Sequence, residues 1–159
     1  MIRPALVALL LLSPVAAFAQ SQLERFEALS EQINLERARL LVREMEAIGG
    51  DARDMQATLP DTGWGDEDRV AGACVLEQYN TAAGTQGTDE MLDRMEAALP
   101  QLATAESLAQ LTFRPDAISD RVSVQIEKSC GLFDIPLRQM KDSGFTNAMM
   151  QAFDTAKTN

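Results

Sequence analysis

The chain has 159 residues, with 14 Lys and Arg against 24 Asp and Glu, two Cys and no His. The net charge of −10 argues against binding to nucleic acid or to anionic membrane surfaces, because both require clustered Lys and Arg. The absence of His removes the commonest general base and metal ligand. The length fits one domain that can build its own core without a structural metal.

The N-terminal segment has the pattern of a secretory signal peptide. Arg3 supplies a positive charge, residues 5–12 are apolar, and residues 17–19 (Ala-Phe-Ala) form a small-x-small cleavage site. An uncleaved anchor is the alternative, but the apolar run is shorter than the roughly 20 residues of a membrane-spanning helix. We therefore predict a signal peptide over 1–19, one helical domain over 20–159, a periplasmic or secreted location, and no insertion into the membrane after cleavage.

Cys74 and Cys130 are the only cysteines. An even number of cysteines in an exported chain predicts a disulfide bond, here between Cys74 and Cys130. A redox-active pair is the alternative, but the two residues lack the Cys-x-x-Cys spacing that lowers the pKa of a thiol. No Cys-x-x-Cys-His motif is present either, which argues against covalently attached haem.

The longest periodic segment covers residues 22–48, where apolar residues recur at threes and fours and predict one long helix. Gly49 and Gly50 follow it, as expected at a helix C-terminus. The apolar stripe drifts around the helix axis and is interrupted by Arg37. This pattern favours a helix of a bundle over a long coiled coil.

Two loops are predicted in the middle of the chain, over 60–65 and 84–87, from their Pro and Gly residues. Residues 51–59 precede the first loop and could form a short helix. Between the loops we predict a helix that starts near Asp66, whose inward side chains are Val70, Cys74 and either Val75 or Leu76. After the second loop, Thr88 is expected to cap a helix that Pro100 ends or kinks.

The C-terminal third contains the one ambiguous segment, residues 121–127. Val122, Val124 and Ile126 alternate as in a strand, whereas Ile118, Val122, Ile126 and Cys130 have the spacing of a helix face. We predict a helix, because no second strand is available for pairing.

Further helices are predicted on both sides of this segment. The first covers residues 101–112. The second follows a break or bend at Gly131 and Pro136, contains Leu137 and Met140, and ends at Gly144. The third covers residues 146–156. In the last of these, Phe145, Met149 and Phe153 are spaced at fours. The predicted fold is an all-α, kinked bundle of four to five main helices in a single small domain.

Trp64, the only tryptophan, lies between two glycines in an acidic loop. With Asp61 and Asp66 it forms a candidate interaction loop, in which an exposed indole could anchor a ligand or partner. The alternative is that the indole folds back over one end of the bundle. The acidic residues do not have the Asp-x-Asp-x-Asp-Gly spacing of a calcium loop, so we predict no metal site.

The remaining chemistry of the sequence is sparse. The methionines could ligate copper or line a binding surface, but core packing explains them best, because no tight Met-x-x-Met cluster occurs. There is no nucleophile elbow, Walker loop or dinucleotide fingerprint. We predict that the protein is not an enzyme and carries no cofactor; a carboxylate pair acting as acid and base is the alternative.

These observations favour a non-catalytic periplasmic protein that acts through protein–protein interaction. Its expected partner is another envelope protein, bound through a helix groove or through the Trp64 loop. The alternative is a periplasmic protein that binds a small molecule or metal ion between the helices of the bundle.

Overall fold

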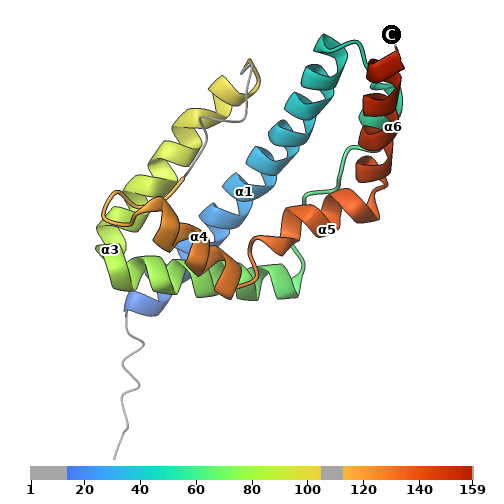
Figure 1. Ribbon diagram of the computed structural model, residues 1–159. Helices are drawn as coiled ribbons and strands as arrows, with labels where there is room; N and C mark the ends of the chain where they lie inside the picture. Colours follow the sequence, from blue (N-terminus) through green and yellow to red (C-terminus); the bar gives the residue numbers. More distant parts are fainter. Residues whose placement is uncertain (1–13, 105–112, 159) are drawn as a thin grey trace, which may run out of the picture.

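A computed structural model describes residues 14–104 and 113–158 (Figure 1). Within these residues the fold is an all-α bundle in one domain, as predicted, with no strand. Residues 1–13 of the expected signal peptide and residues 105–112 of the expected helix 101–112 lie outside the described part. The helices in the described part are α1 (Pro14–Ala47), α2 (Arg53–Ala57), α3 (Asp66–Leu102), α4 (Asp120–Ser129), α5 (Asp134–Asp142) and α6 (Phe145–Thr158).

The long N-terminal helix is the central element of the bundle. In Figure 1, α1 runs diagonally through the middle of the molecule, with α3 on one side and α6 on the other. It covers the predicted helix almost completely and ends just before Gly49, whose φ of 85° is the left-handed conformation that glycine adopts easily. The short α2 also confirms the helix that residues 51–59 could form.

The second long helix, α3, consists of two arms that meet at Gly84 (Figure 1). Gly84 has φ 75° and ψ 161°, a conformation open mainly to glycine. The break is therefore confirmed, but the predicted loop over 84–87 is wrong, because the second arm is helical directly after the corner. Thr88 consequently lies inside the helix, where its hydroxyl donates to the Gly84 carbonyl, and it is not the predicted cap. Pro100 does not end α3, which continues to Leu102.

Val70, which was predicted to point inward, and Val122, which has the spacing of a helix face, both lie at the surface. Val70 is 71% exposed, because the first arm of α3 presents Ala71, Gly72 and Val75 to the core. The 121–127 segment is helical, as predicted, and forms α4. Its Val122 is nevertheless exposed, because Ser123 turns inward to meet a buried hydroxyl.

The C-terminal helices begin after the predicted breaks at Gly131 and Gly144, but Pro136 lies within α5 and does not end a helix. Gly131 and Gly144, at φ 80° and 84°, precede α5 and α6. Leu137 in α5 is 52% exposed and Phe153 in α6 is 46% exposed. The buried residues of α6 are Phe145, Ala148 and Ala152, so the helix packs through positions three and seven residues after Phe145 rather than through every fourth residue.

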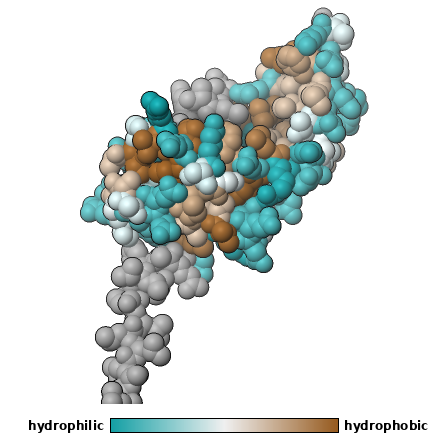
Figure 2. Space-filling view, turned by 60° about the horizontal axis from the view of Figure 1, so that its bottom comes forward, coloured by the Kyte–Doolittle hydropathy of each residue, from teal (hydrophilic) through white to brown (hydrophobic). Residues whose placement is uncertain are grey.

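Buried apolar side chains form two clusters on α1. The Trp64 core gathers residues of α1, α3 and α4 with the loop after α2 and the segment before α4: Phe26, Leu29, Ile33, Trp64, Val75, Leu76, Tyr79, Met91, Leu92, Met95, Leu102, Ile118 and Ile126. The Phe145 core gathers the other end of α1 with α2, α6 and their connection: Ala38, Val42, Met45, Ala52, Met55, Phe145, Ala148 and Ala152. On the face seen in Figure 2, hydrophilic side chains separate the apolar patches.

Ion pairs on the surface join α1 to α3. The Arg69 guanidinium donates to both carboxylate oxygens of Glu27 at 2.8–3.1 Å, and Arg25 reaches Asp93 and Glu96 at 2.7 and 2.6 Å. Exposed pairs of this kind contribute little stability each, and they lie on the side of α1 that α3 covers. Among the described helices, none is both long and apolar enough to cross a membrane.

Candidate functional site: a central cavity

A cavity of about 440 Å³ lies between the two cores. Its size falls within the range typical of sites for small organic molecules. Residues of α1, the 60–65 loop, α4 and α5 surround it, joined by Tyr79 and Met95 of α3 and by Phe113. The aromatic lining consists of the only Trp, the only Tyr and three of the six Phe: Phe26, Trp64, Tyr79, Phe113 and Phe133.

One face of α1 forms the longest wall of the cavity. The residues that line it recur at intervals of three and four, as one face of a helix requires: Phe26, Ser30, Ile33, Asn34, Arg37, Ala38 and Leu41. The apolar members continue the stripe recognised in the sequence. Ser30, Asn34 and Arg37 give this wall its polar groups.

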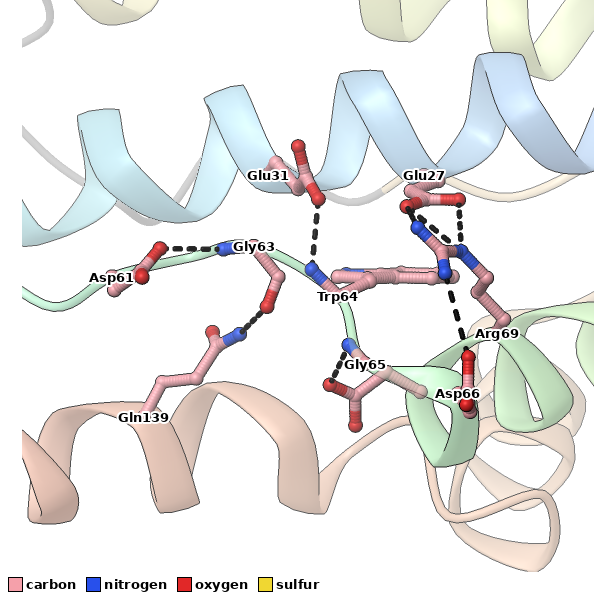
Figure 3. A network of polar contacts seen from close by, with 10 residues as sticks. Glu27, Glu31, Asp61, Gly63, Trp64, Gly65, Asp66, Arg69 and Gln139 are labelled. Carbon is pink, nitrogen blue, oxygen red and sulfur yellow. Dashed lines mark hydrogen bonds and ion pairs between the residues drawn. The ribbon is translucent and has the colours of Figure 1, made fainter.

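The 60–65 loop forms a second wall and is held from both sides (Figure 3). The Trp64 backbone N–H donates to Glu31 Oε1 of α1 at 2.8 Å, and Gln139 Nε2 of α5 donates to the Gly63 carbonyl at 3.2 Å. Asp61 Oδ1 accepts from the Gly63 N–H at 3.0 Å. These bonds keep the loop between α1 and α5 and position its tryptophan.

The indole of Trp64 is only 6% exposed and packs edge-to-face on Phe26, with ring centroids 5.7 Å apart. A Cβ atom at position 72 would lie 2.3 Å from Trp64 Cζ3, so the close approach of α3 requires Gly72. The indole therefore folds back onto the bundle, which is the alternative to an exposed anchor. Asp61 and Asp66 remain at the surface, and a role of this loop in binding a partner stays a prediction.

A buried hydrogen-bond network lies beside the cavity. The Tyr79 hydroxyl is 2.6 Å from Ser123 Oγ, and Glu127 Oε1 accepts from Tyr79 and Ser123 at 2.9 and 3.0 Å. Burial raises the pKa of Tyr79 well above its ordinary value, and the nearby Glu127 carboxylate opposes ionisation further. Glu127 therefore serves as an acceptor for two buried hydroxyl groups at the edge of the cavity.

Arg37 and Glu127 are, among the described residues that line the cavity, its one basic and its one acidic side chain. Arg37 is partly buried, and desolvation lowers the pKa of its guanidinium while the Glu127 carboxylate partly compensates. The guanidinium stays charged at any physiological pH. The cavity thus combines apolar, largely aromatic walls with a fixed positive charge.

Two polar atoms in the cavity walls are buried without a hydrogen-bond partner among the described residues. They are Trp64 Nε1, a donor, and Gln139 Oε1, an acceptor. A buried polar group without a partner costs about 1–3 kcal/mol. Both atoms therefore have hydrogen-bonding capacity that the described residues do not use.

The disulfide between Cys74 and Cys130 is present, as predicted, with a Cα–Cα distance of 5.6 Å. It joins the first arm of α3 to the end of α4, and Gln78 Nε2 lies 3.0 Å from Cys130 Sγ. The bond anchors the helix that carries Glu127 against the helix that carries Tyr79. It thereby fixes one side of the cavity rather than forming part of its lining.

The sequence did not predict which residues line this cavity, although Trp64 and Arg37 were both noted. Arg37 was noted only as an interruption of the apolar stripe of α1, whereas it is the basic group that lines the cavity. In the described residues, no group of three or more Cys, Asp or Glu side chains is arranged to hold a metal ion. Comparisons with models of protein families, with curated proteins and with solved structures gave no significant match.

Proposed function

We propose that the protein binds a small, largely apolar organic molecule in the central cavity. The volume of about 440 Å³ and the concentration of aromatic side chains around it carry this proposal. Apolar walls with a few placed polar groups are typical of ligand sites, and burial of an apolar ligand drives binding there. Binding is proposed rather than catalysis because the sequence offers no His and no recognised catalytic motif.

The entrance to such a site is provided by the turn between α4 and α5 and the start of α5. Phe133 and Leu137 line the cavity and are 45% and 52% exposed. Side chains that contact both the cavity and the solvent form a rim through which an apolar molecule can enter. The same rim supports the second candidate function, in which an apolar segment of an envelope protein is the occupant.

The proposed location is an exported one, in the periplasm or outside the cell. The disulfide supports it, because such bonds persist in oxidising compartments. Intact-mass analysis of the protein purified from the periplasm is expected to give a chain that begins at Gln20 and is two hydrogens lighter than its reduced form. A chain that keeps residues 1–19, or that carries two free thiols, would contradict the proposal for the location.

Trp64 provides a direct test of the site, because it is the only tryptophan and lines the cavity. N-phenyl-1-naphthylamine, an apolar fluorescent probe, is titrated into the protein while Trp64 is excited. Binding in the cavity is expected to quench Trp64 emission, raise probe emission by energy transfer, and saturate at one probe per chain. A linear, unsaturable signal would overturn the proposed function.

A pair of variants on α1 tests whether the probe binds in the cavity. Asn34 lines the cavity, so Asn34→Phe is expected to fill part of it and weaken probe binding about tenfold or more. Gln32 is exposed on the same helix, and Gln32→Phe is expected to leave binding unchanged. Equal affinity of the two variants would show that the probe binds elsewhere.

The test also separates the two candidate functions. A probe that binds in the cavity and is displaced by small organic molecules supports the small-molecule site. A probe that is displaced only by an apolar peptide supports docking of a partner segment at the rim of Phe133 and Leu137.

A further inference from the structure

We infer that the ligand is an amphipathic monocarboxylate, with its carboxylate on Arg37 and its apolar tail along the aromatic wall of the cavity. This inference rests on the proposed function and names the chemical class that the site selects. It follows from the position of Arg37, from the hydrogen bonds of Glu127 and from the polar neighbours of Arg37 on α1.

Arg37 lies on the same face of α1 as Phe26 and Ile33, inside a mainly apolar lining. Desolvation destabilises the Arg37 charge more than the Glu127 carboxylate stabilises it, so a second negative charge placed next to the guanidinium stabilises it further. The planar guanidinium has five N–H donors and matches a carboxylate through two parallel hydrogen bonds. It can therefore hold a ligand carboxylate in addition to contacts with the protein.

Glu127 does not serve a cationic ligand equally well. Its Oε1 accepts hydrogen bonds from two buried hydroxyl groups, those of Tyr79 and Ser123. An ammonium group drawn to Oε1 would compete with both bonds, at a cost to the buried network, and one drawn to either oxygen would meet the positive charge of Arg37, which interacts with Glu127. A carboxylate on Arg37 leaves these two bonds intact, so the hydrogen bonding of the cavity favours an anionic headgroup.

The neighbours of Arg37 complete the headgroup site. Asn34 lies three residues before Arg37 and Ser30 seven residues before it, and all three line the cavity. An amide and a hydroxyl can donate hydrogen bonds to a carboxylate. The tail then extends toward Trp64, Tyr79 and Phe113. Apart from Arg37 itself, Glu127 is the only charged side chain of the described lining.

The experiment compares three molecules that share one tail: decanoate, decanol and decylamine, each displacing N-phenyl-1-naphthylamine from the protein at pH 8. Decanoate is expected to bind about tenfold more tightly than decanol, the change that a charge-assisted hydrogen bond produces. Decylamine is expected to bind more weakly than either. Equal binding of decanoate and decanol, or tightest binding of decylamine, would overturn the inference.

Matched variants assign the preference to Arg37. Arg37→Gln is expected to remove the advantage of decanoate over decanol, while Arg39→Gln, which changes an exposed arginine paired with Glu36, is expected to keep it. Decanol binding shows whether the Arg37→Gln cavity is still formed. If it is not formed, Arg37→Lys is expected to keep a preference for decanoate, and its loss there would contradict the inference.

The two proposals fail in different ways. If the probe does not saturate on the wild-type protein, the proposed function is wrong. If the probe binds in the cavity but the three headgroups do not differ, the function stands and only the ligand class is wrong.

Discussion

The Trp64 core and the Phe145 core lie on the same long helix but are stabilised in different ways. The Trp64 core contains large side chains, a buried network of Tyr79, Ser123 and Glu127, and the disulfide beside it. The Phe145 core contains one aromatic residue among alanines, methionines and a valine. The cavity lies where the two meet, lined by Phe26 and Ile33 from the first and by Ala38 from the second.

This difference shows how a small bundle can keep a cavity open. Bulky aromatic side chains on one side cannot close onto small side chains on the other when both are fixed by separate contacts. The hydrogen bonds of the 60–65 loop and the disulfide fix the Trp64 side. Close packing of α6 on α1 and α2 fixes the Phe145 side.

The largest loss of stability is expected from a change at Phe145, which tests whether the Phe145 core depends on a single side chain. Phe145 is 0% exposed, and Phe145→Ala is expected to lower the free energy of unfolding by about 3–5 kcal/mol. Phe153 on the same helix is 46% exposed, so Phe153→Ala is expected to cost less than about 1 kcal/mol. Urea denaturation measures both, and similar losses would show that the core is not centred on Phe145.

Removal of the disulfide tests the Trp64 side of the comparison. The bond closes a segment with a sequence separation of 56, for which the chain-entropy model gives about 4 kcal/mol of stability. The double variant Cys74→Ser, Cys130→Ser is expected to unfold at lower urea concentration. Hydrogen exchange is expected to accelerate more in α3 and α4 than in α6, and uniform acceleration would contradict two separately stabilised cores.

A smaller effect is expected from Tyr79→Phe, which keeps the ring and removes the hydroxyl. The change removes the bonds of the Tyr79 hydroxyl to Ser123 and Glu127, which keep only their bond to each other, so the expected loss is about 1–3 kcal/mol. The double variant with Ser123→Ala measures the coupling between the two hydroxyl groups. If the two losses are simply additive, the network does not act as a unit.

The smallest effect is expected from alkaline pH. Burial raises the pKa of Tyr79 above the ordinary value of 10.0, so the unfolded chain ionises at lower pH than the folded one. The contribution of Tyr79 to stability is complete below pH 10.0 and decreases as pH rises above it. Because Tyr79 is the only tyrosine, absorbance near the phenolate band reports its ionisation directly.

The control for this titration is Tyr79→Phe, which is expected to lose less stability than the wild type between pH 8 and pH 11. A wild-type tyrosine that ionises in the folded protein near its ordinary pKa would contradict its burial in the network.

Much of the fold could be predicted because it depends on local signals. Helical periodicity, Gly84, the 60–65 loop and the cysteine pair all correspond to features of the structure. The faces of the helices were less predictable. Val70 and Val122 have the spacing of buried residues but lie at the surface, since contacts made by Gly72 and Ser123 orient their helices.

The sequence by itself determined that the chain is helical, that its helices break at glycines and which cysteines pair, because these properties arise from residue conformation and from the number of cysteines. Only the tertiary structure decided that Trp64 folds inward, that Glu127 meets Tyr79, and that Arg37 faces a cavity. These features depend on contacts between residues far apart in the chain. The apolar stripe on α1 does not by itself require a cavity. The cavity lies where the large side chains of the Trp64 core meet the small side chains of the Phe145 core.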